Sequence, residues 1–161
     1  MMIPKELIIL GIGQGWKSAP HVGEAWGVRQ LIGKRPLDRA FKMHTVLRDV
    51  EILSQKKAAE LGIPFYTTHN YPIKEIKEFF KTDFFTNGVC YMLALAIYEG
   101  YKKIDLYGIN QRRELAKEKC GVDYWCGQAM GRGIEVPVHG KYSQLMKTHN
   151  HNIYGYEEKQ G

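Results

Sequence analysis

The sequence predicts an α/β domain of three layers with a mainly parallel sheet. Short apolar runs rich in branched residues alternate with longer segments of helical periodicity through most of the 161 residues. A parallel return between two strands needs a dozen or more residues, and the helical segments supply that length. Hydrophobic residues make up 44% of the chain, which is enough for one sizeable core. The expected fold is therefore Rossmann-like.

The first half of the chain is expected to hold three strands and one helix. A continuous apolar run at residues 7–12 predicts a strand covered on both faces, and shorter strands are expected at 25–28 and 40–43. Thr45 can cap the helix that follows, and Gly62 lies just beyond its end. The apolar face of this helix is expected at Val46, Val50, Leu53 and Leu61.

The second half opens with a strand expected at 64–67 and a short amphipathic helix at 73–80. The clearest helix pattern starts at 86–88, and its apolar positions recur at helical spacing: Val89, Met92, Leu93, Ala96 and Ile97. A strand at 104–108 and a long helix at 115–131 follow. The long helix is expected to bury Ala116, Cys120, Tyr124 and Ala129. A last strand at 133–140 and a short helix at 143–147 complete the prediction.

Composition limits the classes of partner. The formal charge of +6 and pI of about 9.2 favour anionic partners, but the basic residues are scattered in pairs, so a nucleic-acid-binding function ranks last. No apolar segment is long enough to cross a bilayer, which predicts a cytoplasmic protein without membrane partners. Cys90, Cys120 and Cys126 lack metal-ligand spacing, so neither a metal nor a cofactor is expected.

Residues 11–16, GIGQGW, follow the first strand. Ligands of open parallel sheets bind outside the carboxyl ends of the strands, and glycines there let backbone N–H groups approach a phosphate. Trp16 stands where a dinucleotide fingerprint has its third glycine, which disfavours NAD. The motif predicts one wall of a mononucleotide-type cleft, formed by Gly11, Gly13, Gln14, Gly15 and Trp16; a plain turn is the alternative.

Two further stretches are expected at the same edge of the sheet. Thr86, Asn87 and Gly88 start the strongest helix, where they can cap the backbone, meet a ligand, or both. Asn110 and Arg112 follow the strand at 104–108. The Arg112 guanidinium could clamp a phosphate with two hydrogen bonds, or only lie at a helix start.

Residues 84–110, FFTNGVCYMLALAIYEGYKKIDLYGIN, resemble the T-S-G…A-x-A…G-Y-K-E-I-x-L-x-G-I-D block of Campylobacter-type bacterial sialyltransferases. Motility-accessory-factor-like proteins share that block. Three more stretches, WGVR (26–29), DRAFKMHT (38–45) and YWCGQAMGRGI (124–134), resemble small Rossmann-like proteins that are often phage-encoded. The likeness spans most of residues 6–147 and implies a nucleotide or nucleotide-sugar ligand. A phage origin would place the protein in the host cytoplasm.

The resemblance also implies site residues. Gly11, Gly13, Gln14 and Gly15 would hold the phosphate. Residues 26–29, with Trp26 and Arg29, would lie at the second loop. The base or ribose would meet residues 86–88, and His44 would line the cleft at the end of the third strand.

The chain also departs from these families. Arg29 replaces an Asn, and Thr45 and Asn110 each replace an Asp, which predicts a more positive cleft with fewer general bases. The sialyltransferases carry a histidine base between the fifth strand and the long helix, but residues 111–125 contain none. The acidic and phenolic groups there, Glu114, Glu118, Asp123 and Tyr124, do not match its spacing. His44 is left as the best catalytic candidate, with a structural role as the alternative.

These patterns favour one function and leave two open. The first is a domain at 1–147 that binds a nucleotide or nucleotide-sugar and is related to transferases, followed by a polar tail at 148–161 that is expected to be flexible. The second is a non-enzymatic phage protein that sequesters a nucleotide signal, and the third is a nucleic-acid binder. A homo-oligomer is expected, with Trp125 and Met130 as candidate contacts.

Overall fold

The computed structural model describes residues 2–111, 116–148 and 153–156. Within these residues a parallel sheet of five strands has the order β4-β3-β2-β1-β5. The strands are β1 Glu6–Leu10, β2 Glu24–Val28, β3 Arg39–Phe41, β4 Phe65–Tyr66 and β5 Lys103–Tyr107. The helices are α1 Asp49–Glu60, α2 Ile73–Phe80, α3 Gly88–Tyr98 and α4 Ala116–Gly131, with single 3₁₀ turns η1 Trp16–Ser18 and η2 Arg29–Leu31. The prediction of a Rossmann-like α/β fold is confirmed.

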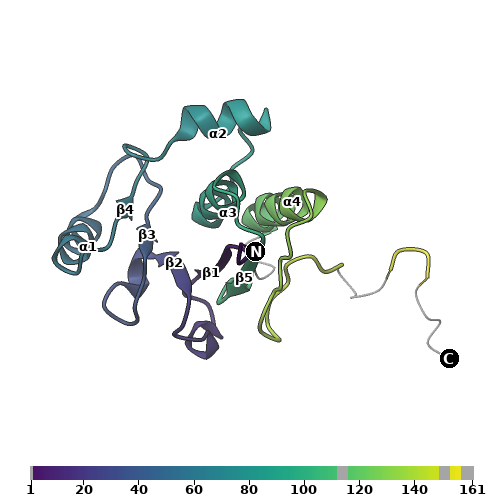
Figure 1. Cartoon of the computed structure of the whole chain (residues 1–161), viewed down its shortest axis with the longest axis horizontal. Coiled ribbons are helices and arrows are strands. Elements are labelled where there is room, and N and C mark those ends of the chain that lie inside the picture. The colour runs from purple at the N-terminus through teal and green to yellow at the C-terminus, as the bar shows by residue number, and fades with distance from the viewer. Residues whose placement is uncertain (1, 112–115, 149–152, 157–161) are drawn as a thin grey trace.

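Alternation along β1 divides the core between the two faces of the sheet. Leu7 and Ile9 pack into the larger apolar cluster with α3 and α4, whereas Ile8 and Leu10 pack into a smaller cluster with Ala58 of α1. Figure 1 shows α3 and α4 side by side over one face of the sheet and α1 beside β4 at its far end. None of the helices that the structure describes is long and apolar enough to cross a membrane.

The chain order of the strands creates a switch point between β1 and β5. From β1 the chain moves outward through β2, β3 and β4, then returns through α2 and α3 to place β5 on the other side of β1. The loops that leave β1 and β5 therefore diverge at the carboxyl edge of the sheet. In open α/β sheets this divergence leaves the crevice in which ligands bind.

Most predicted elements are present with trimmed ends, and α2 has the predicted bounds. In the predicted last strand, residues 135–139 lie along β5: Ile104 N donates to Glu135 O at 2.9 Å and Leu106 N to Pro137 O at 2.9 Å. These are isolated bridges, since Pro137 has no N–H to donate. The helix predicted at 143–147 is wrong, because this segment forms turns.

The predicted start and apolar face of α1 are both wrong. The helix begins at Asp49 with Arg48 as its N-cap residue, so Thr45 does not cap it. Glu51 and Ala58 are the residues of α1 that are buried, whereas the predicted face points outward. Exposed fractions on that face are 79% for Val46, 47% for Val50, 64% for Leu53 and 54% for Leu61.

The buried face of α4 also differs from the prediction. Ala116 and Cys120 are exposed, Tyr124 is half-buried, and of the predicted residues only Ala129 is fully buried. It shares i, i+3, i+4, i+7 spacing with the buried Val122, Trp125 and Cys126. The Trp125 indole is 0% exposed and donates its N–H to the carbonyl of Phe84 at 2.8 Å. Trp125 is therefore a core residue and is not available for an oligomer contact, whereas Met130 is 51% exposed.

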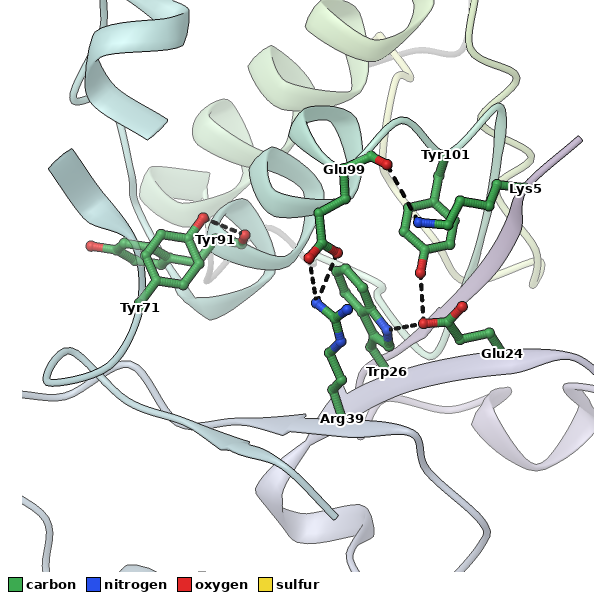
Figure 2. A network of polar contacts seen from close by, with 8 residues as sticks. All are labelled: Lys5, Glu24, Trp26, Arg39, Tyr71, Tyr91, Glu99 and Tyr101. Atoms are coloured by element: carbon green, nitrogen blue, oxygen red, sulfur yellow. Dashed lines mark hydrogen bonds and ion pairs between the residues drawn. The ribbon is translucent and has the colours of Figure 1, made fainter. Parts of the chain in front are cut away.

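A polar network fixes the C-terminal end of α3 at the amino edge of the sheet (Figure 2). Glu99 accepts two hydrogen bonds from Arg39 Nη1, at 2.8 and 3.0 Å, and the Arg39 guanidinium lies 4.4 Å from the centre of the Trp26 ring. Glu24 accepts from Trp26 Nε1 at 3.0 Å and from the Tyr101 hydroxyl at 2.6 Å. Burial and the Glu24 carboxylate raise the pKa of Tyr101, so its hydroxyl stays a donor at neutral pH.

The corrected face of α4 can be tested by two truncations on the same helix. Trp125→Ala removes a fully buried ring and its hydrogen bond, and should lower the free energy of unfolding by about 3–5 kcal/mol. Cys120→Ala, on the exposed face, should change it by less than about 0.5 kcal/mol. Urea unfolding of the two variants measures both values, and a larger loss for Cys120→Ala would contradict this placement of the helix.

Candidate functional site

A cavity of about 420 Å³ lies at the switch point. The loops after β1 and β5 and the start of α3 form its walls, and we call it the first chamber. It brings together six of the residues predicted from the sequence: Gly11, Gly13, Gln14, Asn87, Gly88 and Asn110. A cavity of this size is typical of small-molecule sites.

Glycines allow the loops after β1 and β5 to touch. Gly11 N donates to Tyr107 O at 2.9 Å, and Gly13 N donates to Gly108 O at 2.8 Å. A Cβ atom at Gly11 or Gly13 would lie 2.5 or 2.6 Å from Gly108 O. The two N–H groups expected to hold a phosphate are thus already donated within the protein, and these glycines instead let two backbone segments meet.

The start of α3 lies between the two loops and α4. Asn87 is its N-cap residue, and its Oδ1 accepts from the N–H groups of Val89 at 3.1 Å and Cys90 at 3.3 Å. Thr86 does not cap the helix; its hydroxyl donates to the carbonyl of Glu118 in α4 at 2.7 Å. A Cβ atom at Gly88 would meet no atom within 4 Å, so the first helical residue faces open space.

A second cavity, of about 470 Å³, adjoins the first and is here called the second chamber. The two share Val28, Asn87, Gly88 and Glu118, so they form one cleft divided at the start of α3. Its other walls come from the ends of β2 and β3 and from the segment before α3: Gln30, Phe41, Lys42, Met43, His44, Phe85, Thr86 and Tyr91. The predicted residues His44 and Thr86 therefore belong to this chamber.

The polar side chains of the first chamber are amides and one carboxylate. Glu118 is the only titratable side chain among the described residues that line it. Asn110 and Gln111 are 7% and 8% exposed, and the described structure gives no hydrogen-bond partner to Asn110 Oδ1 or Gln111 Oε1. Buried amide oxygens are normally paired, and the described residues provide no donor for these two. No group of three His, Cys, Asp or Glu residues in the described chain could hold a metal ion.

The second chamber contains Lys42 and His44. His44 is exposed at the end of β3, and Lys42 is half-buried beside it. Lys42 Nζ lies 3.3 Å from Glu51 Oε1, which ties this wall to α1. The backbone N–H and guanidinium of Arg48, with a smaller contribution from Lys42, lower the pKa of Glu51 to about 2.

The structure places four predicted site residues outside the two chambers. Trp26 is 0% exposed in the core beneath α3, because the alternation of β2 turns it inward. Arg29 points toward α1, where its Nη1 donates to Ser54 Oγ at 3.5 Å. Gly15 precedes η1 with a φ of 106°, and Trp16 packs against the smaller core cluster.

Arg112 lies outside the described residues. The sequence did not single out Lys42 or Tyr91, and it raised Glu118 only as a replacement for the absent histidine. Lys42 follows the end of β3, which is the signal that could have found it.

No family model matches the sequence, and no curated protein matches it. Among solved structures, the sialyltransferase CstII from Campylobacter jejuni in complex with cytidine-5'-monophosphate is similar, with 14% identity, a TM-score of 0.47, and coverage of 92% of this chain and 88% of that chain. The sialyltransferase CST-II with a trisaccharide acceptor and CMP has 16% identity, a TM-score of 0.44, and coverage of 83% and 80%. The C. jejuni enzyme with CMP-3FNeuAc has 14% identity, a TM-score of 0.43, and coverage of 92% and 88%. Similarity at this level assigns no function to this chain.

Gly108→Ala tests the contact between the two loops. Gly108 and Gly100 both have positive φ values, 68° and 86°, but a Cβ atom would lie 2.6 Å from Gly11 O at Gly108 and would meet nothing within 4 Å at Gly100. Gly100→Ala should therefore cost only the conformational strain, about 1–2 kcal/mol. Gly108→Ala should lose a further ~1–3 kcal/mol because the loops must separate. Equal losses in denaturant unfolding would show that the loops do not depend on this contact.

The low pKa of Glu51 predicts an acid-sensitive contribution to stability. The folded-state pKa of about 2 lies below the unfolded value of about 4.3, so the ionised carboxylate stabilises the fold above that value and loses its effect as the pH falls toward 2. Glu51→Gln should be destabilised at pH 7, and its deficit against the wild type should shrink between about pH 4.3 and 2.

Denaturant unfolding at several pH values measures this deficit. Glu78→Gln, an exposed substitution on α2, is the matched control and should stay close to the wild type throughout. A Glu51→Gln deficit that stays constant with pH would argue against the ion-paired carboxylate.

Proposed function

We propose that the cleft binds a nucleotide or nucleotide-sugar, with the nucleoside in the first chamber and the anionic group toward the second. The observation that carries this proposal is the pair of chambers at the switch point, which meet at the start of α3. A ligand that spans both chambers would pass Gly88, where a helix presents its positive end and no side chain.

The lining of the first chamber favours a ligand that donates hydrogen bonds. The Glu118 carboxylate only accepts hydrogen bonds, and the hydroxyl groups of a ribose or the exocyclic amine of a base could donate to it; the amide side chains of Asn110 and Gln111 line the same chamber. Glu118 lines both chambers, and its carboxylate would repel a phosphate placed beside it. The anionic part of the ligand is therefore assigned to the side of the second chamber that carries Lys42 and His44.

The start of α3 and the second chamber suit the anionic part. Asn87 Oδ1 accepts from only two of the N–H groups that open α3, and the Gly88 N–H is not one of them. The described structure gives the His44 ring no hydrogen-bond partner, so it can donate to a phosphate or a sugar carboxylate. Lys42 adds positive charge beside it, shared with Glu51.

Gly88→Phe tests the proposal because it fills the junction of the chambers without a clash inside the protein. A panel of nucleoside mono- and diphosphates, cyclic nucleotides and nucleotide-sugars is added to the full chain, and thermal unfolding is followed. The best ligand, at one hundred times its Kd, should stabilise the wild type by about 2.7 kcal/mol. Gly88→Phe should abolish that shift.

Gly127→Phe is the matched control, since Gly127 is an exposed helical glycine with no atom within 4 Å of its Cβ position and lies outside both chambers. It should keep the full ligand-induced shift. The proposal is wrong if no member of the panel stabilises the wild type, or if Gly88→Phe responds like Gly127→Phe. Mass spectrometry of the ligand after incubation separates simple binding from turnover: an unchanged ligand supports binding alone.

A further inference from the structure

Helix α1 packs with its apolar face toward solvent. Its buried residues are Glu51 and Ala58, whereas Leu53 lies on the opposite side and is 64% exposed. At 100° per residue, Val50 falls on the same side as Leu53, and Leu61 extends this stripe just past the end of the helix. Helices of this length are marginal on their own and are normally stabilised by burying their apolar face. The exposed stripe therefore lacks the cover that such a face usually has.

Two side chains of opposite charge flank the stripe, one near each end of the helix. Asp49 stands in the first turn of α1 and Lys56 near its end, and helical geometry places both on the same side of Leu53. Both residues are exposed, and no ion pair is found for either one within the described chain. The stripe thus has Asp49 near one end and Lys56 near the other, with Leu53 between them; Glu60 in the last turn is also exposed.

We infer that α1 packs antiparallel against α1 of a second copy of this chain, about a two-fold axis beside Leu53. This axis places the two Leu53 side chains against each other. It also brings Asp49 of each copy to Lys56 of the other, so both charges are paired twice. Val50 then meets the aliphatic stem of Lys57 from the second copy.

The observations favour a second copy over an unrelated partner. A two-fold contact uses the same surface on both chains, so that surface must be complementary to itself when reversed. Asp49 and Lys56, on either side of Leu53 along α1, meet this condition without help from another element. Figure 1 shows α1 at the far end of the sheet from α4, so α4 does not obstruct such an approach.

Sedimentation equilibrium of the full chain tests the interface. The wild type should be a dimer. Leu53→Glu places two carboxylates at the axis and should give a monomer with unchanged circular dichroism, since this residue is 64% exposed within its own chain. Val22→Glu, at another apolar position that is 76% exposed, should remain a dimer.

Charge reversal tests the antiparallel arrangement. Asp49→Lys and Lys56→Asp should each weaken dimerisation by about tenfold, because like charges then face each other across the interface. The double variant restores both opposite-charge pairs and should recover the wild-type dissociation constant. A monomeric wild type, a dimeric Leu53→Glu variant, or a double variant as weak as the single ones would each overturn the inference.

Discussion

The backbone contact between the loops after β1 and β5 is the constraint on which the cleft depends. Gly11 and Gly13 donate their N–H groups to Tyr107 and Gly108, and a side chain at either glycine would collide with the carbonyl of Gly108. This contact holds the ends of the two central strands together at the switch point. It leaves the first chamber above them, lined by backbone and by the amides of Asn110 and Gln111. The glycine motif therefore shapes the site chiefly by letting two loops of the same chain pack against each other.

The start of α3 forms the wall that the two chambers share, and its position is set because both ends of this helix are fixed. At the amino edge of the sheet, Glu99 is paired with Arg39, which also lies over Trp26 (Figure 2). At the carboxyl edge, Asn87 caps the helix and Thr86 bonds to the backbone of Glu118. The body of the helix is apolar on all sides and buried, as expected for a central helix. The positive end of α3 is thus held at the junction of the two chambers.

Local signals were sufficient to predict the fold and part of the site. The apolar run of β1, the bounds of α2 and the Asn87 cap of α3 are all present where the sequence indicates them. The face of α1 could not be predicted, because Glu51 is drawn inward by Arg48 and by Lys42, which precedes the helix by several residues. The role of Gly13 depends on Gly108, nearly a hundred positions away. Trp26 was assigned to the cleft from its motif, although the alternation of β2 places it in the core.

Amide NMR spectra of the full chain can show whether one ligand occupies both chambers on either side of Gly88. A nucleotide-sugar is titrated into isotope-labelled protein while the backbone signals are followed. We expect saturable shifts in the first chamber at Gly13, Asn110 and Gln111, at Gly88, and in the second chamber at His44. Shifts that avoid these residues, or an unchanged spectrum at saturating ligand, would contradict the proposal that one ligand occupies both chambers.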